Sequence, residues 1–187
     1  METERLKVGE TRYEIELYHC EESESPRDWD NLSRIVMMPL SEYELAGKND
    51  IVLGENWHSS DAQEAEEQAF GVELPLIMLD HGGISLSTNR EWPYNCQWDA
   101  GQIGVIGITA EDMAKNKISE EQARVIIEGE ISAFNQYLAG EVYGYDLTKL
   151  SPYGENDELI DSLGGIYPSD NQTPMEAAKE TIDIELL

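Results

Sequence analysis

Apolar residues alternate with polar ones near the start of the chain. In residues 12–18, Tyr13, Ile15 and Leu17 occupy every second position. A period of two is typical of a strand with one buried face. Shorter apolar stretches, bounded by turn-forming residues, indicate additional strands. These lie at residues 32–38, 76–79, 103–108 and 141–147.

A second spacing, of three and four residues, predicts one long helix over residues 120–139. Ser119 and Gln122 have the spacing of a capping box at its start, and Gly140 follows its end. The apolar residues of its predicted buried face are Ile127, Ile131, Phe134 and Leu138. Shorter helices are predicted at residues 60–70, 110–117 and 174–186, after the capping residues Ser60 or Asp61, Thr109 and Thr173.

This mixture of strands and helices favours an α+β fold with a mostly antiparallel sheet, one long packing helix (120–139) and short peripheral helices. A chain of 187 residues is long enough for one domain with an appendage. We expect a single α+β domain over residues 1–150. Residues 151–187 hold nine acidic residues and one lysine, and are expected to form an acidic C-terminal extension whose terminal helix packs on the same domain.

The charge of the chain limits its partners. The sequence has 39 acidic and 12 basic residues, a net charge of −27. This argues against direct binding to nucleic acid or to an anionic membrane, and favours a strongly basic protein partner. No apolar run is long enough to span a membrane, and the charged N-terminus does not resemble a signal peptide. We therefore expect a cytoplasmic protein.

Many of the acidic residues fall in three clusters. Carboxylates displayed in rows on a rigid scaffold can occupy the site where a DNA-binding protein holds phosphates. Clustered acids also bind calcium, but the spacing of an EF-hand loop is absent. The candidate partner-binding residues are Glu21, Glu22, Glu24, Asp28 and Asp30; Glu64, Glu66 and Glu67; and Asp157, Glu158 and Asp161.

The stretch from residue 74 to residue 109 is the least charged part of the chain. It holds the residues best suited to catalysis or metal binding. Asp80 and His81 precede two glycines, and Cys96 and Asp99 follow. A Cys–His nucleophile or a metal site is conceivable, but neither has a recognisable spacing. A histidine before glycines is more often a turn residue. We therefore assign no catalytic residue, metal or cofactor.

Four motifs occur in order and resemble a family of small acidic proteins carried by bacteriophages and other mobile elements. The resemblance covers about residues 25–147. It implies no catalytic residues. It does favour a role against host defence, because acidic DNA mimics are common among anti-restriction and anti-CRISPR proteins. The motifs are SPRDWDNL (25–32), PL with DHGGI (75–84), WDAGQIG (98–104) and YLAGEVYGY (137–145).

Three hypotheses for function follow. The first is a non-enzymatic inhibitor of a host nucleic-acid-binding defence complex, which docks carboxylate clusters on a basic surface. CRISPR effectors are the first expected partner, and restriction enzymes are the second. The second hypothesis is a small phage enzyme or metalloprotein that uses His81, Asp80, Asp99 and Cys96. The third is an adaptor whose acidic residues serve only its solubility.

Overall fold

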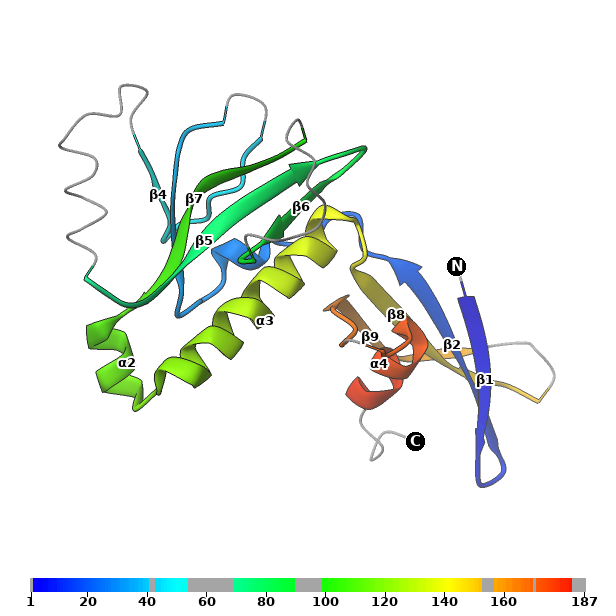
Figure 1. Cartoon of the computed structure of the whole chain (residues 1–187). Helices are drawn as coiled ribbons and strands as arrows, with labels where there is room; N and C mark the ends of the chain where they lie inside the picture. The colour runs from blue at the N-terminus through cyan, green and yellow to red at the C-terminus, as the bar shows by residue number, and fades with distance from the viewer. Residues whose placement is uncertain are drawn as a thin grey trace. The chain divides into compact units, whose positions relative to one another are not determined.

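The computed structural model describes residues 2–40, 43–53, 69–89, 99–152, 157–169 and 171–182 (Figure 1). The chain forms two compact units. Unit 1 consists of residues 1–24 and 140–187, and unit 2 consists of residues 25–139. The expected domain at 1–150 and extension at 151–187 do not coincide with these units, because the chain after residue 150 completes the same sheet as the N-terminal strands.

Unit 1 is an antiparallel four-stranded sheet in the order β1-β2-β8-β9, with one helix against it. Helix α4 contacts β2, β8 and β9 (Figure 1). The predicted alternation in β2 is confirmed, because Tyr13, Ile15 and Leu17 are all buried. The elements are β1 (Glu2–Val8), β2 (Thr11–His19), β8 (Tyr143–Leu150), β9 (Glu158–Ile166) and α4 (Pro174–Thr181).

Helix α4 begins with a capping box. Thr173 accepts a hydrogen bond from the backbone of Glu176, and the Glu176 carboxylate accepts from the backbone and hydroxyl of Thr173. These bonds lower the pKa of Glu176. The predicted helix is confirmed as far as Thr181. Ile182 is extended and ends the helix, and residues 183–186 of the prediction lie outside the described residues.

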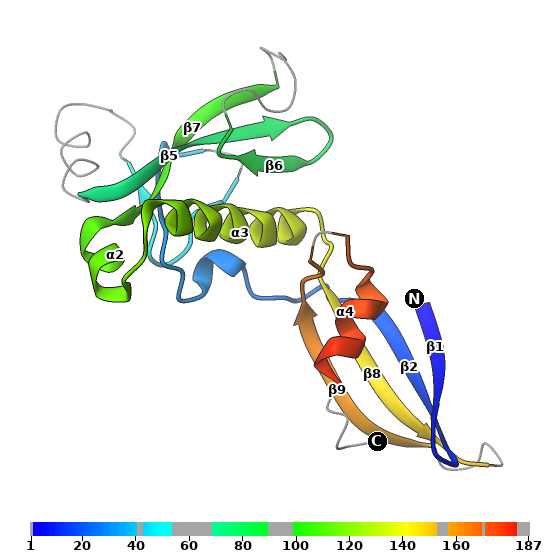
Figure 2. The ribbon, with the colours of Figure 1, turned by 60° about the horizontal axis from the view of Figure 1, so that its bottom comes forward.

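Unit 2 is a five-stranded sheet in the order β4-β3-β7-β5-β6, in which only the β3–β4 pair is parallel. Helix α3 packs against β5, β6 and β7 (Figure 2). The elements are η1 (Pro26–Asp28), β3 (Arg34–Met37), β4 (Ile51–Val52), β5 (Phe70–Asp80), β6 (Ile84–Ser87), β7 (Ala100–Thr109), α2 (Ala110–Asn116) and α3 (Glu120–Leu138).

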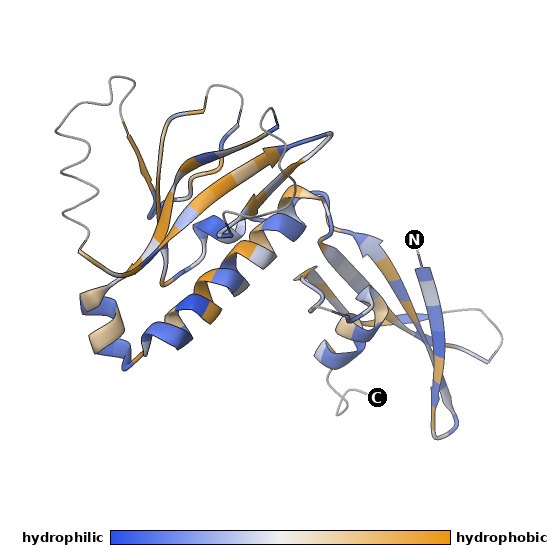
Figure 3. Cartoon of the chain, viewed as in Figure 1, coloured by the Kyte–Doolittle hydropathy of each residue, from blue (hydrophilic) through white to orange (hydrophobic). Residues whose placement is uncertain are grey.

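The core of unit 2 lies between the sheet and α3. The long strands β5 and β7, which pair with each other, carry much of the hydrophobic colour in this sheet (Figure 3). The predicted capping box of α3 is present, and Ile127, Ile131 and Phe134 are buried as its period predicts. The α+β class is therefore confirmed, with two sheets.

The shorter predicted elements had mixed outcomes. The helix predicted at 110–117 is confirmed as α2. The helix predicted at 60–70 lies mostly outside the described residues, and its last residue, Phe70, begins β5. The sequence patterns did not predict strands β1, β4, β6 and β9. Among the described residues, no helix has the length and apolar character needed to cross a bilayer.

Candidate functional site

The first predicted acidic cluster is divided between the two units. Glu21, Glu22 and Glu24 belong to unit 1 and are exposed. Asp28 and Asp30 belong to unit 2, where both engage Lys48. Asp28 Oδ1 accepts a hydrogen bond from the Lys48 backbone at 3.1 Å, and Asp30 Oδ1 lies 3.6 Å from Lys48 Nζ.

The other two clusters are only partly described. Glu64, Glu66 and Glu67 lie outside the described residues. In the third cluster, Asp157 and Glu158 are exposed and Asp161 is half-buried, and two of these carboxylates accept hydrogen bonds within unit 1. Asp157 Oδ1 accepts from the Ser151 backbone at 2.7 Å, and Asp161 Oδ2 accepts from the Tyr145 hydroxyl at 2.6 Å.

The negative charge is shared by both units. Unit 1 has 19 acidic and 5 basic residues, a net charge of −14, and unit 2 has 20 acidic and 7 basic residues, a net charge of −13. Several of the bases are already engaged with acids, so little positive charge remains to offset the others. The basic residues in ion pairs within the described ranges are Arg5, Lys7, Arg27, Arg34, Lys48 and Lys179.

Strand pairing brings together two acids that lie 130 residues apart in the sequence and belong to no shared motif. Glu16 of β2 lies directly opposite Asp146 of β8, on the sheet face away from Tyr145 and α4. Like charges directly opposite each other in a sheet destabilise it. Asp146 accepts a hydrogen bond from Ser162 at 2.7 Å. The alternation of β2 could have placed Glu16 on an outer face, but only the register supplies its neighbour.

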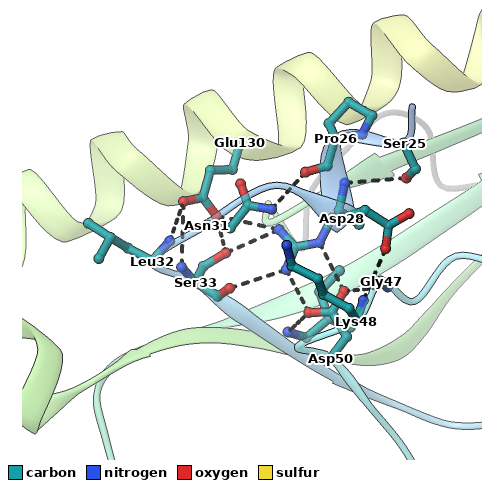
Figure 4. A network of polar contacts seen from close by, with 12 residues as sticks. Ser25, Pro26, Asp28, Asn31, Leu32, Ser33, Gly47, Lys48, Asp50 and Glu130 are labelled. Atoms are coloured by element: carbon teal, nitrogen blue, oxygen red, sulfur yellow. Dashed lines mark hydrogen bonds and ion pairs between the residues drawn. The ribbon is translucent and has the colours of Figure 1, made fainter. Parts of the chain in front are cut away.

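The most extensive polar network in the described structure surrounds Arg27, which is 2% exposed (Figure 4). Its guanidinium binds Asp50 through two bonds, from Nε at 3.0 Å and from Nη2 at 2.6 Å. Nη1 and Nη2 also donate to the hydroxyl and carbonyl of Ser33. Nη1 lies 3.4 Å from Glu130 Oε2. Two carboxylates and one guanidinium therefore share one desolvated site.

The two carboxylates of this network also accept hydrogen bonds from backbone amides (Figure 4). Asp50 accepts from the backbone of Ile35 at 2.7 Å and of Gly47 at 2.9 Å. Glu130 accepts from the backbone of Leu32 at 3.0 Å and from the Ser33 hydroxyl. The network therefore joins η1, the loop before β4 and helix α3. We interpret it as a structural centre of unit 2.

No sequence motif predicted this network, although one signal for it was present. Glu130 lies three residues after Ile127 and four before Phe134, on the buried face of α3. An acid on an apolar face needs a partner of opposite charge. Arg27 lies within the motif SPRDWDNL, so part of the resemblance falls on this network.

The candidate chemical residues come together only in part. His81 Nδ1 lies 3.1 Å from Asp99 Oδ2, and the His81 side chain is 78% exposed. Asp80 accepts from the Tyr43 hydroxyl at 2.7 Å. Cys96 lies outside the described residues. In the part of the chain that the structure describes, no three His, Cys, Asp or Glu residues are grouped to hold a metal ion.

A buried hydroxyl under α4 gives unit 1 a measurable pH dependence. Tyr145 is fully buried. Burial and the hydrogen bond to Asp161 raise its pKa to about 12 from an ordinary value of 10.0, against a smaller opposing effect of Thr181. The protonated form is therefore favoured in the folded state. Its contribution to stability is fully present below pH 10 and is lost as the pH rises from 10 to 12.

We expect unit 1 to lose about 1.4 kcal/mol of unfolding free energy through Tyr145 between pH 9 and pH 11. Urea unfolding followed by far-ultraviolet circular dichroism measures this loss. Tyr145→Phe should be about 1 kcal/mol less stable at pH 7, because the hydrogen bond to Asp161 is gone. The alkaline loss should be smaller in this variant. An equal alkaline loss in both proteins would contradict the assignment to Tyr145.

Among the charged groups of the described residues, the exposed acids of both units, the Glu16–Asp146 pair and the His81–Asp99 pair are available for contact with another molecule. The Arg27 network and the Tyr145–Asp161 bond serve the fold. No family model, curated protein or solved structure matches this chain.

Proposed function

We propose that this chain is a non-enzymatic inhibitor of a host nucleic-acid-binding defence complex and that it acts by nucleic-acid mimicry. A guide-loaded CRISPR effector is the first proposed partner, and a restriction enzyme is the second. The carboxylates would dock on Lys and Arg side chains that otherwise hold DNA or guide RNA. The observation that supports this most strongly is the charge of each unit, −14 and −13, which exceeds what the few bases can offset.

The placement of the acids also supports the proposal. Glu16 and Asp146 lie opposite each other, which lowers the stability of the sheet. The same pair strengthens the negative electrostatic potential at that surface. We assign contact with the partner to the members of the predicted clusters that are exposed, to the half-buried Asp28, and to this pair. Asp161 is better explained by its bond to Tyr145. The assigned residues are Glu16, Glu21, Glu22, Glu24, Asp28, Asp30, Asp146, Asp157 and Glu158.

Salt dependence tests the mechanism. Affinity for a purified guide-loaded effector, measured by biolayer interferometry, should fall steeply as salt rises from about 50 to 200 mM, because charge contacts are screened. Replacing Glu21, Glu22 and Glu24 by glutamine should lower the affinity about tenfold at the lower salt concentration and should flatten the salt dependence. DNA should compete with the wild-type protein for the effector.

The matched control replaces the same three glutamates by aspartate, which preserves the charge and changes only the length of the side chains. It should retain most of the affinity. Binding that is indifferent to salt would contradict mimicry. Inhibition that survives reversal of all the assigned acids to lysine would also contradict it.

A further inference from the structure

The two sheets have four edge strands among the described residues. They are β1 and β9 in unit 1 and β4 and β6 in unit 2. The outer backbone groups of an edge strand can pair with another chain, and short edges limit such pairing. β4 has two residues and β6 has four, whereas β1 has seven and β9 has nine. Unit 1 therefore holds the two long edges.

The β1 edge carries basic side chains, and charged residues are a common protection of sheet edges. Arg5 Nε lies 2.6 Å from Glu14 on the neighbouring strand. Lys7 Nζ lies 3.8 Å from Glu10 in the turn that follows, and Lys179 of α4 pairs with Glu4. Ion pairs and helix α4 therefore hold the side chains of this edge.

The β9 edge carries two acids, Glu158 and Asp161, but no basic side chain. Its sequence, ELIDSLGGI, contains no lysine, arginine or proline. Two large apolar side chains are exposed along it, Leu159 at 59% and Leu163 at 41%. Within the described ranges, β9 pairs with β8 on one side and with no strand on the other. An edge with exposed leucines and no base is suited to accept another strand.

Irregular pairing places the two leucines on opposite faces. Leu159 is opposite Thr148, on the uncovered face, and Leu163 is opposite Tyr145, on the face of α4. A register shift between Leu147 and Thr148 separates these pairs. A strand beside β9 projects its side chains alternately to the two faces, so it would contact one leucine on each face. The bulges restrict the ladder to a short segment.

We propose that the outer edge of β9 accepts an extended, basic segment of a partner protein as an additional strand. The sign of the partner's charge rests on the proposed function and on charge complementarity with unit 1, whose net charge is −14. A second copy of this chain is the wrong occupant, because two molecules of charge −27 repel each other. Backbone hydrogen bonds supply affinity. Leu159 favours apolar side chains on the uncovered face, and Glu158 and Asp161, which lie opposite Lys149 and Leu147 on the other face, favour basic ones.

Nuclear magnetic resonance of the full-length, ¹⁵N-labelled protein tests this pairing. The probe is a synthetic peptide of about ten residues in which lysine alternates with valine. We expect shift changes in residues 158–166 and at least about tenfold slower amide hydrogen exchange there. The control peptide has the same charge, but proline replaces each valine, so it cannot extend the ladder. It should cause neither effect in β9.

The double variant Leu159→Lys with Leu163→Lys places basic side chains on the β9 edge, as β1 has in Arg5 and Lys7. It should weaken binding of the valine–lysine peptide at least tenfold. The matched control is Val8→Lys with Val125→Lys. It makes the same change of charge at exposed apolar positions, 40% and 65% exposed, in β1 and α3 instead of β9. It should keep most of the affinity.

Three outcomes would overturn the pairing. The first is equal effects of the two peptides on β9, and the second is shift changes spread over the acids of both units. The third is a dimer formed through β9 without peptide, since the occupant would then be a second copy. None of these results changes the salt test of mimicry with the effector. Conversely, β9 pairing with the peptide can succeed when the effector test fails, so the two proposals fail separately.

Discussion

Replacing Arg27 by alanine is expected to lower the unfolding free energy of unit 2 by about 3–5 kcal/mol. The change leaves Asp50, whose side chain is fully buried, and Glu130, 15% exposed, without their cation. An uncompensated buried carboxylate is far more costly than the loss of the hydrogen bonds alone. All four tryptophans of the sequence lie in unit 2, so tryptophan fluorescence during urea unfolding measures this loss.

Arg34→Ala is the matched control, because it removes an arginine from the same unit. The side chain of Arg34 is 43% exposed and lies 3.9 Å from Asp112, so its loss should cost less than about 1 kcal/mol. Adding Asp50→Asn to Arg27→Ala should recover part of the stability, since one buried charge is then removed. A loss below about 1 kcal/mol in Arg27→Ala would show that the network does not hold unit 2 together.

Gly104→Ala is expected to destabilise unit 2 by about 3 kcal/mol, at the upper end of ordinary overpacking costs. A Cβ atom at Gly104 would meet the carbonyl oxygen of Val36 and would lie 2.7 Å from Met37 Cα. Both belong to the backbone of β3, which cannot move aside as a flexible side chain can. Relief of the clash therefore requires β3 and β7 to separate where Met37 pairs with Gly104.

Gly101→Ala provides the control in the same strand. A Cβ atom at Gly101 meets nothing within 4 Å, and the stability of unit 2 should change by less than about 0.5 kcal/mol. The comparison separates close packing at one position from a general effect of glycine in β7. Equal losses in the two variants would contradict the packing argument.

The elements that were predicted correctly have one buried face and a regular period. β2 and α3 show this, because their apolar positions face a core without interruption. β1 and β9 were missed because edge strands are exposed over most of their length and carry little apolar alternation. In β9, register shifts also break the period of two, so Leu159 and Leu163 gave no strand pattern.

The candidate site was harder to predict because it depends on pairings between distant positions. Arg27 and Glu130 are separated by 103 residues, and only the packing of α3 beside η1 brings them together. The Glu16–Asp146 pair depends in the same way on the β2–β8 register. The total charge and its clusters could be counted directly, but the sequence did not distinguish Asp161, which holds Tyr145, from exposed Glu158.

The arrangement of the units along the chain has a consequence for synthesis on the ribosome. β2 pairs with β8, so His19 lies opposite Tyr143, and the whole of segment 25–139 is translated between them. The nascent chain therefore completes unit 2 before unit 1 can close its sheet, and unit 1 is the later of the two to mature. Until then Tyr13, Ile15 and Leu17 lack the later residues against which they pack. The surrounding acidic residues help to keep that segment soluble.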